Sequence, residues 1–317
     1  MDHDLENFTY EPMYIEEYVP IFHMSFYIEV LYVIAYLADL SMTIYLIVVI
    51  KKFKTLENSR SYKYLFAYAI SNLCYILLSQ TIGMFLQVIT NGLTSRGMFI
   101  LANIDNCCME LGFYILTFMA IDWYVFNYYK CFYDNHLKVF NRGVLTLFLI
   151  FLFKSVVAVV VCFPNDDMEG TLMFYIFLDS FSLVSFYLCF IMLTFLFIKW
   201  KRKTTSNIAR KYEYSLIIPW TYFMMSLPMN IVNIYPIFWS PPYGNALYDT
   251  IDMSTGILSN MALVVIVFLL GKYDKHFKMA YLKCCKRRYK NNNFQDEVSE
   301  DGSEENGVTY DGHVVSL

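Results

Sequence analysis

Long apolar runs alternate along the chain with short polar stretches that hold most of the charged residues. An α-helix rises 1.5 Å per residue, so about 20 apolar residues cross the roughly 30 Å hydrocarbon core of a bilayer. The pattern therefore predicts an all-α membrane protein built as a seven-transmembrane helix bundle. The predicted spans are Phe26–Ile50, Tyr64–Ile89, Met98–Phe126, Gly143–Phe163, Thr171–Ile198, Tyr214–Phe238 and Ile251–Leu270.

Three shorter segments flank the bundle, which occupies residues 26–270. Residues 1–25 are acidic and aromatic, and we expect them to form a short extracellular N-terminal segment. Residues 271–285 mix basic and apolar side chains in a pattern typical of an amphipathic helix at the membrane surface. Residues 286–317 are polar and acidic, which predicts a disordered cytoplasmic tail.

The third span carries polar residues at spacings that place them on one side of a helix. At about 100° per residue, Asn103, Asn106, Glu110 and Thr117 fall on a stripe about 60° wide. Polar groups inside a bilayer need protein or trapped water around them, so we expect this helix to lie among the other spans. The stripe can serve as helix–helix contact only, or it can line a ligand site and carry a signal.

Composition supports the membrane assignment and narrows the function. Hydrophobic residues make up 57% and aromatic residues 19% of the chain, and mean hydropathy is +0.42, unlike a soluble domain. The sequence has no metal-ligand spacing and no nucleotide-binding loop. We therefore expect no enzyme activity, no cofactor, no metal site and no nucleic-acid partner.

The basic residues predict how the chain is oriented. Of the 24 Lys and Arg residues, 22 lie before span two, between spans three and four, between spans five and six, or after span seven. Cytoplasmic segments carry the excess of basic residues, which places the N-terminus outside and the C-terminus in the cytoplasm of a plasma-membrane protein. Asn7 lies in a sequon on the outer side and is a candidate glycosylation site.

Matching depths predict two polar contacts between spans. Asp39 and Asn72 lie about 16 and 12 Å from the inner ends of their spans, and Asn260 of span seven lies at a similar height. These three residues can share a water or sodium cluster, or simply form hydrogen bonds between helices. Glu110 and Lys154 also match, at about 18 and 16 Å, which predicts an ion pair that acts as a register pin or as a switch.

Acidic residues near the outer ends of the spans suggest a ligand cavity. Asp105, Asp179 and Asp252 come from spans three, five and seven, and together they can form an acidic upper cavity for a small, cationic or amphipathic ligand. The alternative is that these carboxylates are simply solvated.

Seven spans with an outer N-terminus resemble the rhodopsin-like G-protein-coupled receptors, and several motifs carry the resemblance. Asp122-Trp123-Tyr124 ends span three where the family has Asp-Arg-Tyr, with Trp123 in the place of the arginine. Ser226-Leu227-Pro228 stands in the place of Trp-x-Pro in span six, so Pro228 is retained in the helix that the family uses as a switch. Asn260 is the one remnant of Asn-Pro-x-x-Tyr.

These eroded signatures resemble the nematode serpentine chemoreceptor families. The resemblance implies a receptor that senses an extracellular small molecule or peptide and signals to a heterotrimeric G protein through motion of span six. Cys284 and Cys285, which follow the amphipathic segment near the bilayer, are candidate palmitoylation sites, and membrane lipid is an expected partner.

Two other functions remain open at the level of the sequence. The buried charges Asp39, Glu110 and Lys154 are also found in transporters and channels, although the chain has no inverted repeat. A non-signalling heptahelical membrane protein is the third possibility, because an indole at position 123 cannot replace the ionic role of arginine.

Overall fold

The computed structural model describes residues 19–82, 95–162, 168–203, 213–234 and 246–285, and within these ranges every regular element is a helix. Residues 1–18 of the predicted extracellular segment, which include Asn7, lie outside the described residues, as does the tail from residue 286, whereas residues 19–25 are helical as the first turns of α1. The elements are α1 (Val19–Lys52), α2 (Lys54–Asn58), α3 (Arg60–Cys74), the π-helix η1 (Tyr75–Ile82), α5 (Ser95–Tyr128), α6 (Lys130–Asn135), α7 (Leu137–Cys162), α8 (Met168–Lys203), α9 (Tyr214–Val232), α11 (Ala246–Asn260), α12 (Ala262–Tyr273) and α13 (Lys275–Cys285).

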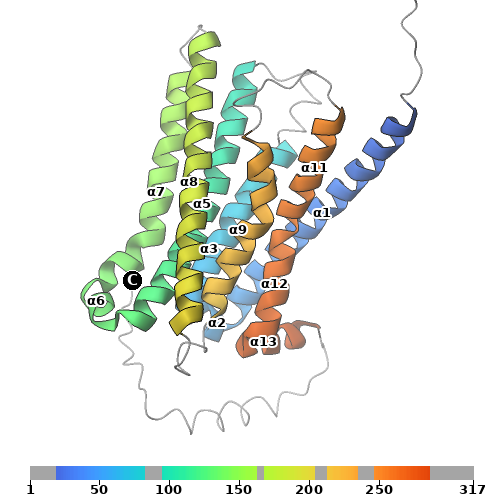
Figure 1. The fold of residues 1–317 in the computed structure, drawn as a ribbon. Coiled ribbons are helices and arrows are strands. Elements are labelled where there is room, and N and C mark those ends of the chain that lie inside the picture. Colours follow the sequence, from blue (N-terminus) through green and yellow to red (C-terminus); the bar gives the residue numbers. More distant parts are fainter. Residues whose placement is uncertain (1–18, 83–94, 163–167, 204–212, 235–245, 286–317) are drawn as a thin grey trace, which may run out of the picture.

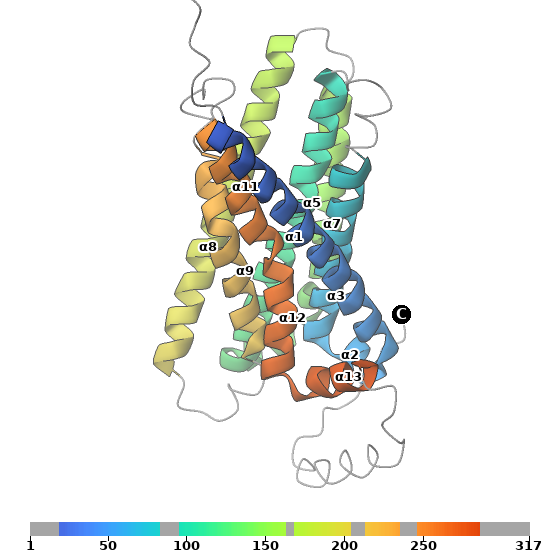
Figure 2. The same cartoon turned by 90° about the vertical axis from the view of Figure 1, so that its right-hand side faces the viewer.

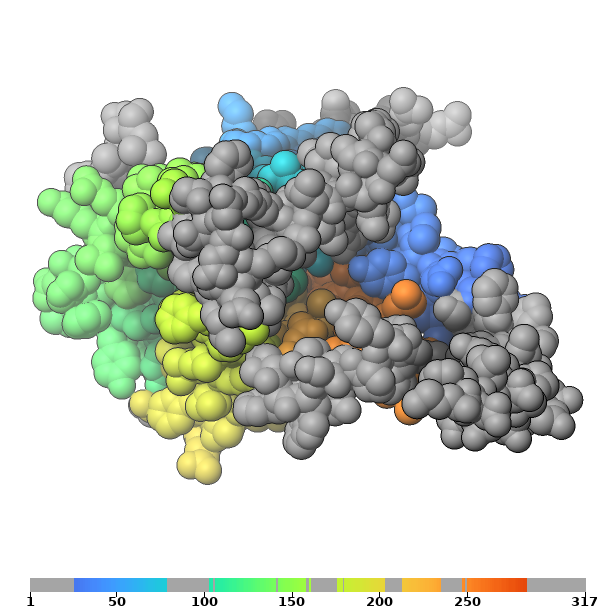
Figure 3. Space-filling model, turned by 90° about the horizontal axis from the view of Figure 1, so that it is seen from above, coloured from blue at the N-terminus to red at the C-terminus, as the bar shows by residue number. Residues whose placement is uncertain are grey.

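The long helices run side by side, and α5 lies at the centre of the bundle. It contacts α3, α7, α8 and α9, while α1 packs on α3 and on the α11–α12 pair, which in turn packs on α9. The short helices α2, α6 and α13 lie together at one end, which we call the α13 end (Figures 1 and 2). From the opposite end, α7 and α8 lie on one side of the molecule and α1 on the other (Figure 3). The central position of α5 agrees with its polar stripe.

Five helices within the described residues are long and apolar enough to cross a membrane: Phe26–Lys52, Asn106–Tyr128, Ile176–Arg202, Tyr214–Val232 and Thr250–Tyr273. The outward faces of α1, α7 and α8 are apolar as well, which inverts the pattern of a water-soluble bundle. Large exposed side chains on these faces include Leu31, Ile34, Phe148, Phe153, Leu188 and Phe195. Membrane insertion is compatible with this surface, and the count of seven crossings stays a prediction.

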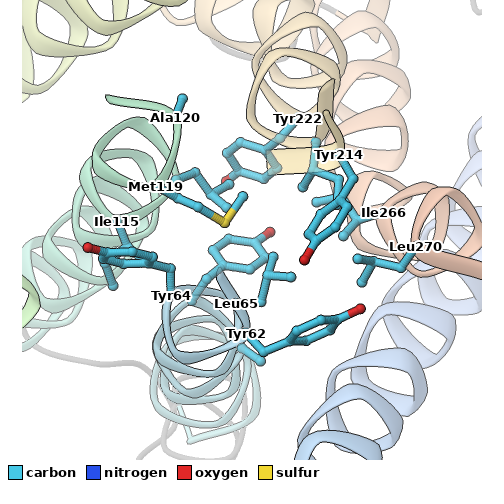
Figure 4. Close-up of a cluster of buried hydrophobic side chains, with 14 of the residues drawn as sticks. Tyr62, Tyr64, Leu65, Ile115, Met119, Ala120, Tyr214, Tyr222, Ile266 and Leu270 are labelled. Carbon is cyan, nitrogen blue, oxygen red and sulfur yellow. The ribbon is translucent and has the colours of Figure 1, made fainter. Parts of the chain in front are cut away.

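Buried side chains from α3, α5, α9 and α12 converge in the hydrophobic core (Figure 4). Tyr62, Tyr214 and Phe223 are among the largest side chains that are fully buried. At the crossing of α5 and α7, a Cβ atom on Gly143 would lie 2.3 Å from the ring of Phe118. Glycine therefore lets these two helices approach closely.

The boundaries differ from the predicted spans in two informative places. Span two was expected to be one α-helix, but its regular turns end at Cys74 and continue as the π-helix η1. Span seven is divided after Asn260, although the hydrogen bonds from Met261 N to Ile257 O and from Val265 N to Met261 O continue across the division at 3.0 and 3.1 Å. Neither place contains Pro or Gly, so the sequence pattern gave no signal for them.

The predicted amphipathic segment is helical as α13. Phe277 and Ala280 face the bundle and are buried, whereas Lys275 and Lys278 are exposed. The predicted inner loops are also more helical than expected, because basic stretches after spans one and three contain α2 and α6. Pro236, near the end of the predicted span Tyr214–Phe238, lies outside the described residues.

Candidate functional site

The polar stripe of α5 points into the bundle. Asn103, Glu110 and Thr117 are buried, with exposed fractions of 5%, 1% and 4%. Asn106 is half-buried on the same face. Asp122, near the end of the helix, is buried too. The stripe therefore meets protein along its whole described length, as the packing argument predicts.

Glu110 lies in an ion pair that joins α5 to α7. The ammonium group of Lys154 donates to Glu110 Oε1 at 2.5 Å, as the matching depths of the two residues predict. The Lys154 ammonium also lies 5.5 Å from the ring centre of Phe181 on α8, a distance suited to a cation–π contact. One pair of charges thus ties three helices together.

A small cavity adjoins this ion pair on the inner side of the bundle. It has a volume of about 20 Å³ and lies between α5, α8 and α9. Its wall combines amides, a hydroxyl and a carboxylate with apolar side chains. The lining residues are Asn106, Met109, Glu110, Phe113, Ser182, Leu183, Asn230 and Asn233.

A second cavity, of about 30 Å³, holds the predicted polar cluster. Asn72 Nδ2 lies 3.1 and 3.3 Å from the two carboxylate oxygens of Asp39 and donates to Thr43 Oγ1 at 2.9 Å. Asn260 lines the same cavity, and its buried Nδ2 makes no hydrogen bond to any residue that the structure describes. The volume suits a bound water, so all three residues of the cluster are within reach of one small polar guest.

The Asp122-Trp123-Tyr124 motif lies at the α13 end with all three residues buried. The carboxylate of Asp122 accepts from Arg60 Nε at 2.9 Å, and the guanidinium of Arg60 stacks on the ring of Tyr133 in α6 with its carbon 5.0 Å from the ring centre. A cation therefore does lie beside Asp122, but it comes from the start of α3. Sequence reasoning had counted Arg60 only as a loop charge, although depth matching would have found it.

The start of α9 is held against α3 by neutral groups, and α3 in turn bonds the residue that precedes α13. The hydroxyls of Ser61 and Ser215 lie 3.0 Å apart, and the rings of Tyr62 and Tyr214 are 6.0 Å apart between centres. The Tyr62 hydroxyl also donates to Asp274 Oδ2 at 2.8 Å. Burial raises the pKa of the Tyr62 phenol and the nearby Asp274 carboxylate raises it further, so the phenol stays neutral and keeps its donor.

Asp274 has a second structural role at the start of α13. Its Oδ1 accepts from the backbone N–H groups of His276 and Phe277 at 2.7 and 3.2 Å, which is the geometry of a helix N-cap. Phe277 then stacks on Tyr62 with ring centres 6.2 Å apart. This junction was not predicted, because the sequence shows Asp274 only as one acid within a basic stretch.

Helix α9 joins the two ends of the bundle. It contains Pro219 and Pro228, and the missing N–H of Pro228 leaves the carbonyl of Met224 without its usual helical donor. Ser226 Oγ lies 3.3 Å from Ser259 Oγ of α11, and Asn230 Nδ2 donates to Ser226 O at 2.9 Å. Pro228 therefore lies beside polar contacts that can rearrange.

Other predicted site residues are placed less completely. Asp105 and Asp179 belong to α5 and α8, but their side chains are outside the described part of the structure. Asp252 is half-buried on α11, and its carbonyl accepts from Thr255 Oγ1 at 2.9 Å. The side chains of Cys284 and Cys285, the last residues of α13, are outside the described part as well. The acidic upper cavity and the palmitoylation sites stay predictions.

No protein-family model matches this chain, and no curated protein sequence matches it. Functional inference therefore depends on its own residues and on their arrangement.

Proposed function

We propose that the chain is a seven-transmembrane G-protein-coupled receptor of the plasma membrane, with its N-terminus outside, that senses an extracellular small molecule or peptide. One observation carries the proposal: helix α9, which contains Pro219 and Pro228, lines a polar cavity with Asn230 and reaches the α13 end with Tyr214 and Ser215. A ligand and a cytoplasmic partner would thus act on the same helix.

The proposed signal is a movement of α9 about Pro228. A ligand that contacts Asn230 would favour a different bend, and the inner end of α9 would leave α3. The hydroxyl contact between Ser61 and Ser215 is neutral and breaks at small cost compared with a buried ion pair. The opened face would include the surroundings of Trp123, where a heterotrimeric G protein would bind.

The basic residues at the α13 end favour a cytoplasmic position for that end. Lys51, Lys130, Lys201 and Lys278 are exposed there and suit the anionic headgroups of the inner leaflet. Palmitoyl chains on Cys284 and Cys285 would hold α13 at the same surface. Membrane lipid is thus a partner along the bundle and at this end.

The test is ligand-dependent activation of a G protein in a heterologous cell that expresses the full chain. A screen of small soluble and volatile compounds should yield agonists in the native chain, and Pro228→Ala should lose most of the response while surface expression is retained. Trp123→Arg serves as the second variant. If coupling appears only with arginine at this position, the native chain is a non-signalling heptahelical protein.

A transporter or channel is the competing function, because Asp39, Glu110 and Lys154 are charged residues inside the bundle. Their partners weaken this alternative: Lys154 bonds Glu110, and Asn72 bonds Asp39. A substrate flux without any G-protein response would nevertheless favour it. Glycosylation at Asn7 tests the orientation, since an unmodified Asn7 that is reachable only from the cytosol would contradict the receptor proposal.

A further inference from the structure

The cavity between α5, α8 and α9 has an unusual charge arrangement. Among the described residues that line it, Glu110 is the only charged one. The balancing charge, Lys154, is not part of the wall; it reaches Glu110 from α7 at 2.5 Å. A carboxylate is therefore present in the cavity, but its negative charge is already compensated by Lys154, which lies outside the cavity wall.

We propose that this cavity recognises an uncharged ligand group that both donates and accepts hydrogen bonds, and that Lys154 sets this selectivity by neutralising Glu110. The inference rests on the proposed function for the role of the cavity as a ligand site. The acidic upper cavity would suggest a cationic ligand. We infer a neutral group instead, such as an amide or a hydroxyl.

The wall residues suit such a group. The side-chain amide of Asn233 offers donors and an acceptor, and Asn230, which donates one N–H to Ser226 O, keeps its second N–H and its amide oxygen. Ser182 donates to Leu178 O at 3.1 Å, which leaves its oxygen lone pairs to accept. A neutral guest can exchange hydrogen bonds with these groups without the large cost of burying a charge.

A cationic guest is disfavoured for an electrostatic reason. It would have to share Glu110 with an ammonium that is already in contact, and two like charges at this spacing repel strongly in a medium of low polarity. An anionic guest would meet the carboxylate itself. Both ions would also lose their hydration, so the neutral form of a given head group is the one that the cavity favours.

Stability alone gives no reason for this pair. Replacing a buried ion pair by apolar residues of similar volume is often neutral or stabilising, because desolvation offsets most of the attraction. Phe153 and Val156, which flank Lys154 and Ser155 in α7, are apolar and exposed. A lysine in that setting is explained if its charge tunes the group that it contacts inside.

The cavity volume limits the group that is recognised. About 20 Å³ has room for one or two waters, so it fits a head group of a few heavy atoms rather than a whole ligand. Asn233 directly follows the last residue of α9 at the end away from α13. The remainder of a larger ligand would extend toward that end.

The experiment uses the full chain in lipid nanodiscs and three matched probes: acetamide, ethylammonium and acetate. Probes this small bind weakly, so concentrations on the order of 10 mM are required. Acetamide should raise the apparent Tm of the native chain by about 2 °C, and the two ions should not. In Lys154→Met, ethylammonium should become the stabilising probe because Glu110 is left to pair with it.

Two variants make the result specific. Ser182→Leu fills the cavity and should abolish the acetamide shift, whereas Lys278→Met, an exposed lysine on α13, should behave as the native chain does. Lys154→Arg keeps the charge and should keep the preference for acetamide, which covers the case in which Lys154→Met fails to fold.

The proposal is overturned if ethylammonium stabilises the native chain at least as well as acetamide. It is overturned equally if the acetamide shift survives Ser182→Leu, or if Lys154→Arg or a folded Lys154→Met lacks the expected preference. The readout is binding and needs no G protein, so failure of the proposed receptor function would be seen separately as absent coupling with the binding pattern intact.

Discussion

The two halves of the bundle hold their polar groups in different ways. At the α13 end, side-chain contacts link separate elements: Arg60 bonds Asp122, Ser61 meets Ser215, and Tyr62 bonds Asp274. In the other half, polar groups line two cavities, and the charges of Glu110 and Lys154 lie next to one of them. One half is cross-linked and closed, while the other retains space that a guest can enter.

The difference predicts that the α13 end is the more rigid half and that the half with the cavities can respond to a guest. Closely packed aromatic and hydroxyl groups favour one arrangement, because breaking the bond of Arg60 to Asp122 or of Tyr62 to Asp274 leaves a buried group unsatisfied. Groups around a cavity can exchange partners with a small guest at lower cost. We therefore expect substitutions to act on stability at the α13 end, and on stability and guest selectivity in the half with the cavities.

The largest stability effect is expected where a charge would be left alone. Lys154→Met should lower the free energy of unfolding by about 3–5 kcal/mol, because the Glu110 carboxylate loses its partner at 1% exposure. Combining it with Glu110→Leu should restore most of the loss. Thermal unfolding in nanodiscs measures both, and a single variant as stable as the native chain would show that the pair contributes little.

A smaller loss is expected for the ion pair at the α13 end. Arg60→Ala should cost about 1–3 kcal/mol, since it removes the bond to Asp122 and the stacking on Tyr133 together. Amide hydrogen exchange in α6 should rise by about tenfold or more, because this helix loses a contact to the bundle. Arg142→Ala is the control, as Arg142 is exposed nearby. Unchanged exchange in α6 would contradict the proposed anchoring.

A still smaller loss of stability is expected for the bond between Tyr62 and Asp274. Tyr62→Phe keeps the ring contacts and removes only the donor to Asp274, so a loss of about 1–2 kcal/mol is expected. Tyr273→Phe is the matched control at an exposed tyrosine. A loss equal to that of the control would mean that the buried hydrogen bond is unimportant.

The smallest effects on stability are expected in the polar cluster, where Asn72 and Asn260 should differ. Asn72 donates to Asp39 and Thr43, so Asn72→Ala should cost about 1–2 kcal/mol. Asn260 makes no bond to described residues through its Nδ2, and Asn260→Ala should cost about 0.5 kcal/mol or less. Equal losses in thermal unfolding would show that an ordered water or ion joins Asn260 to the cluster.

The sequence predicted contacts between spans wherever the constant rise of a helix could convert residue numbers into depth in the bundle. Counting residues from the inner ends of the spans brought Glu110 to Lys154 and Asp39 to Asn72, and the structure places both pairs in contact. The same count could have linked Arg60 to Asp122, but Arg60 lies at a span boundary and was taken for a loop charge. Boundaries are where a hydropathy pattern is least precise.

Other features depend on contacts that no local pattern encodes. The bond from Tyr62 to Asp274 joins residues far apart in the chain, and neither residue has a motif around it. The π-helix η1 and the division after Asn260 occur without Pro or Gly, the usual signals of irregular helices. Both irregularities adjoin the cavity that contains Asp39, since Tyr75 and Asn260 line it.

Asp274 also determines where α12 ends and α13 begins. Its extended backbone, with φ −111° and ψ 115°, separates α12 from α13, and its side chain fixes the first turn of the new helix. Were Asp274 replaced by a strong helix former such as alanine, both segments could fuse into one straight rod pointing away from the bilayer. If α13 lies on the lipid surface, as proposed, its basic and aromatic side chains would then leave that surface.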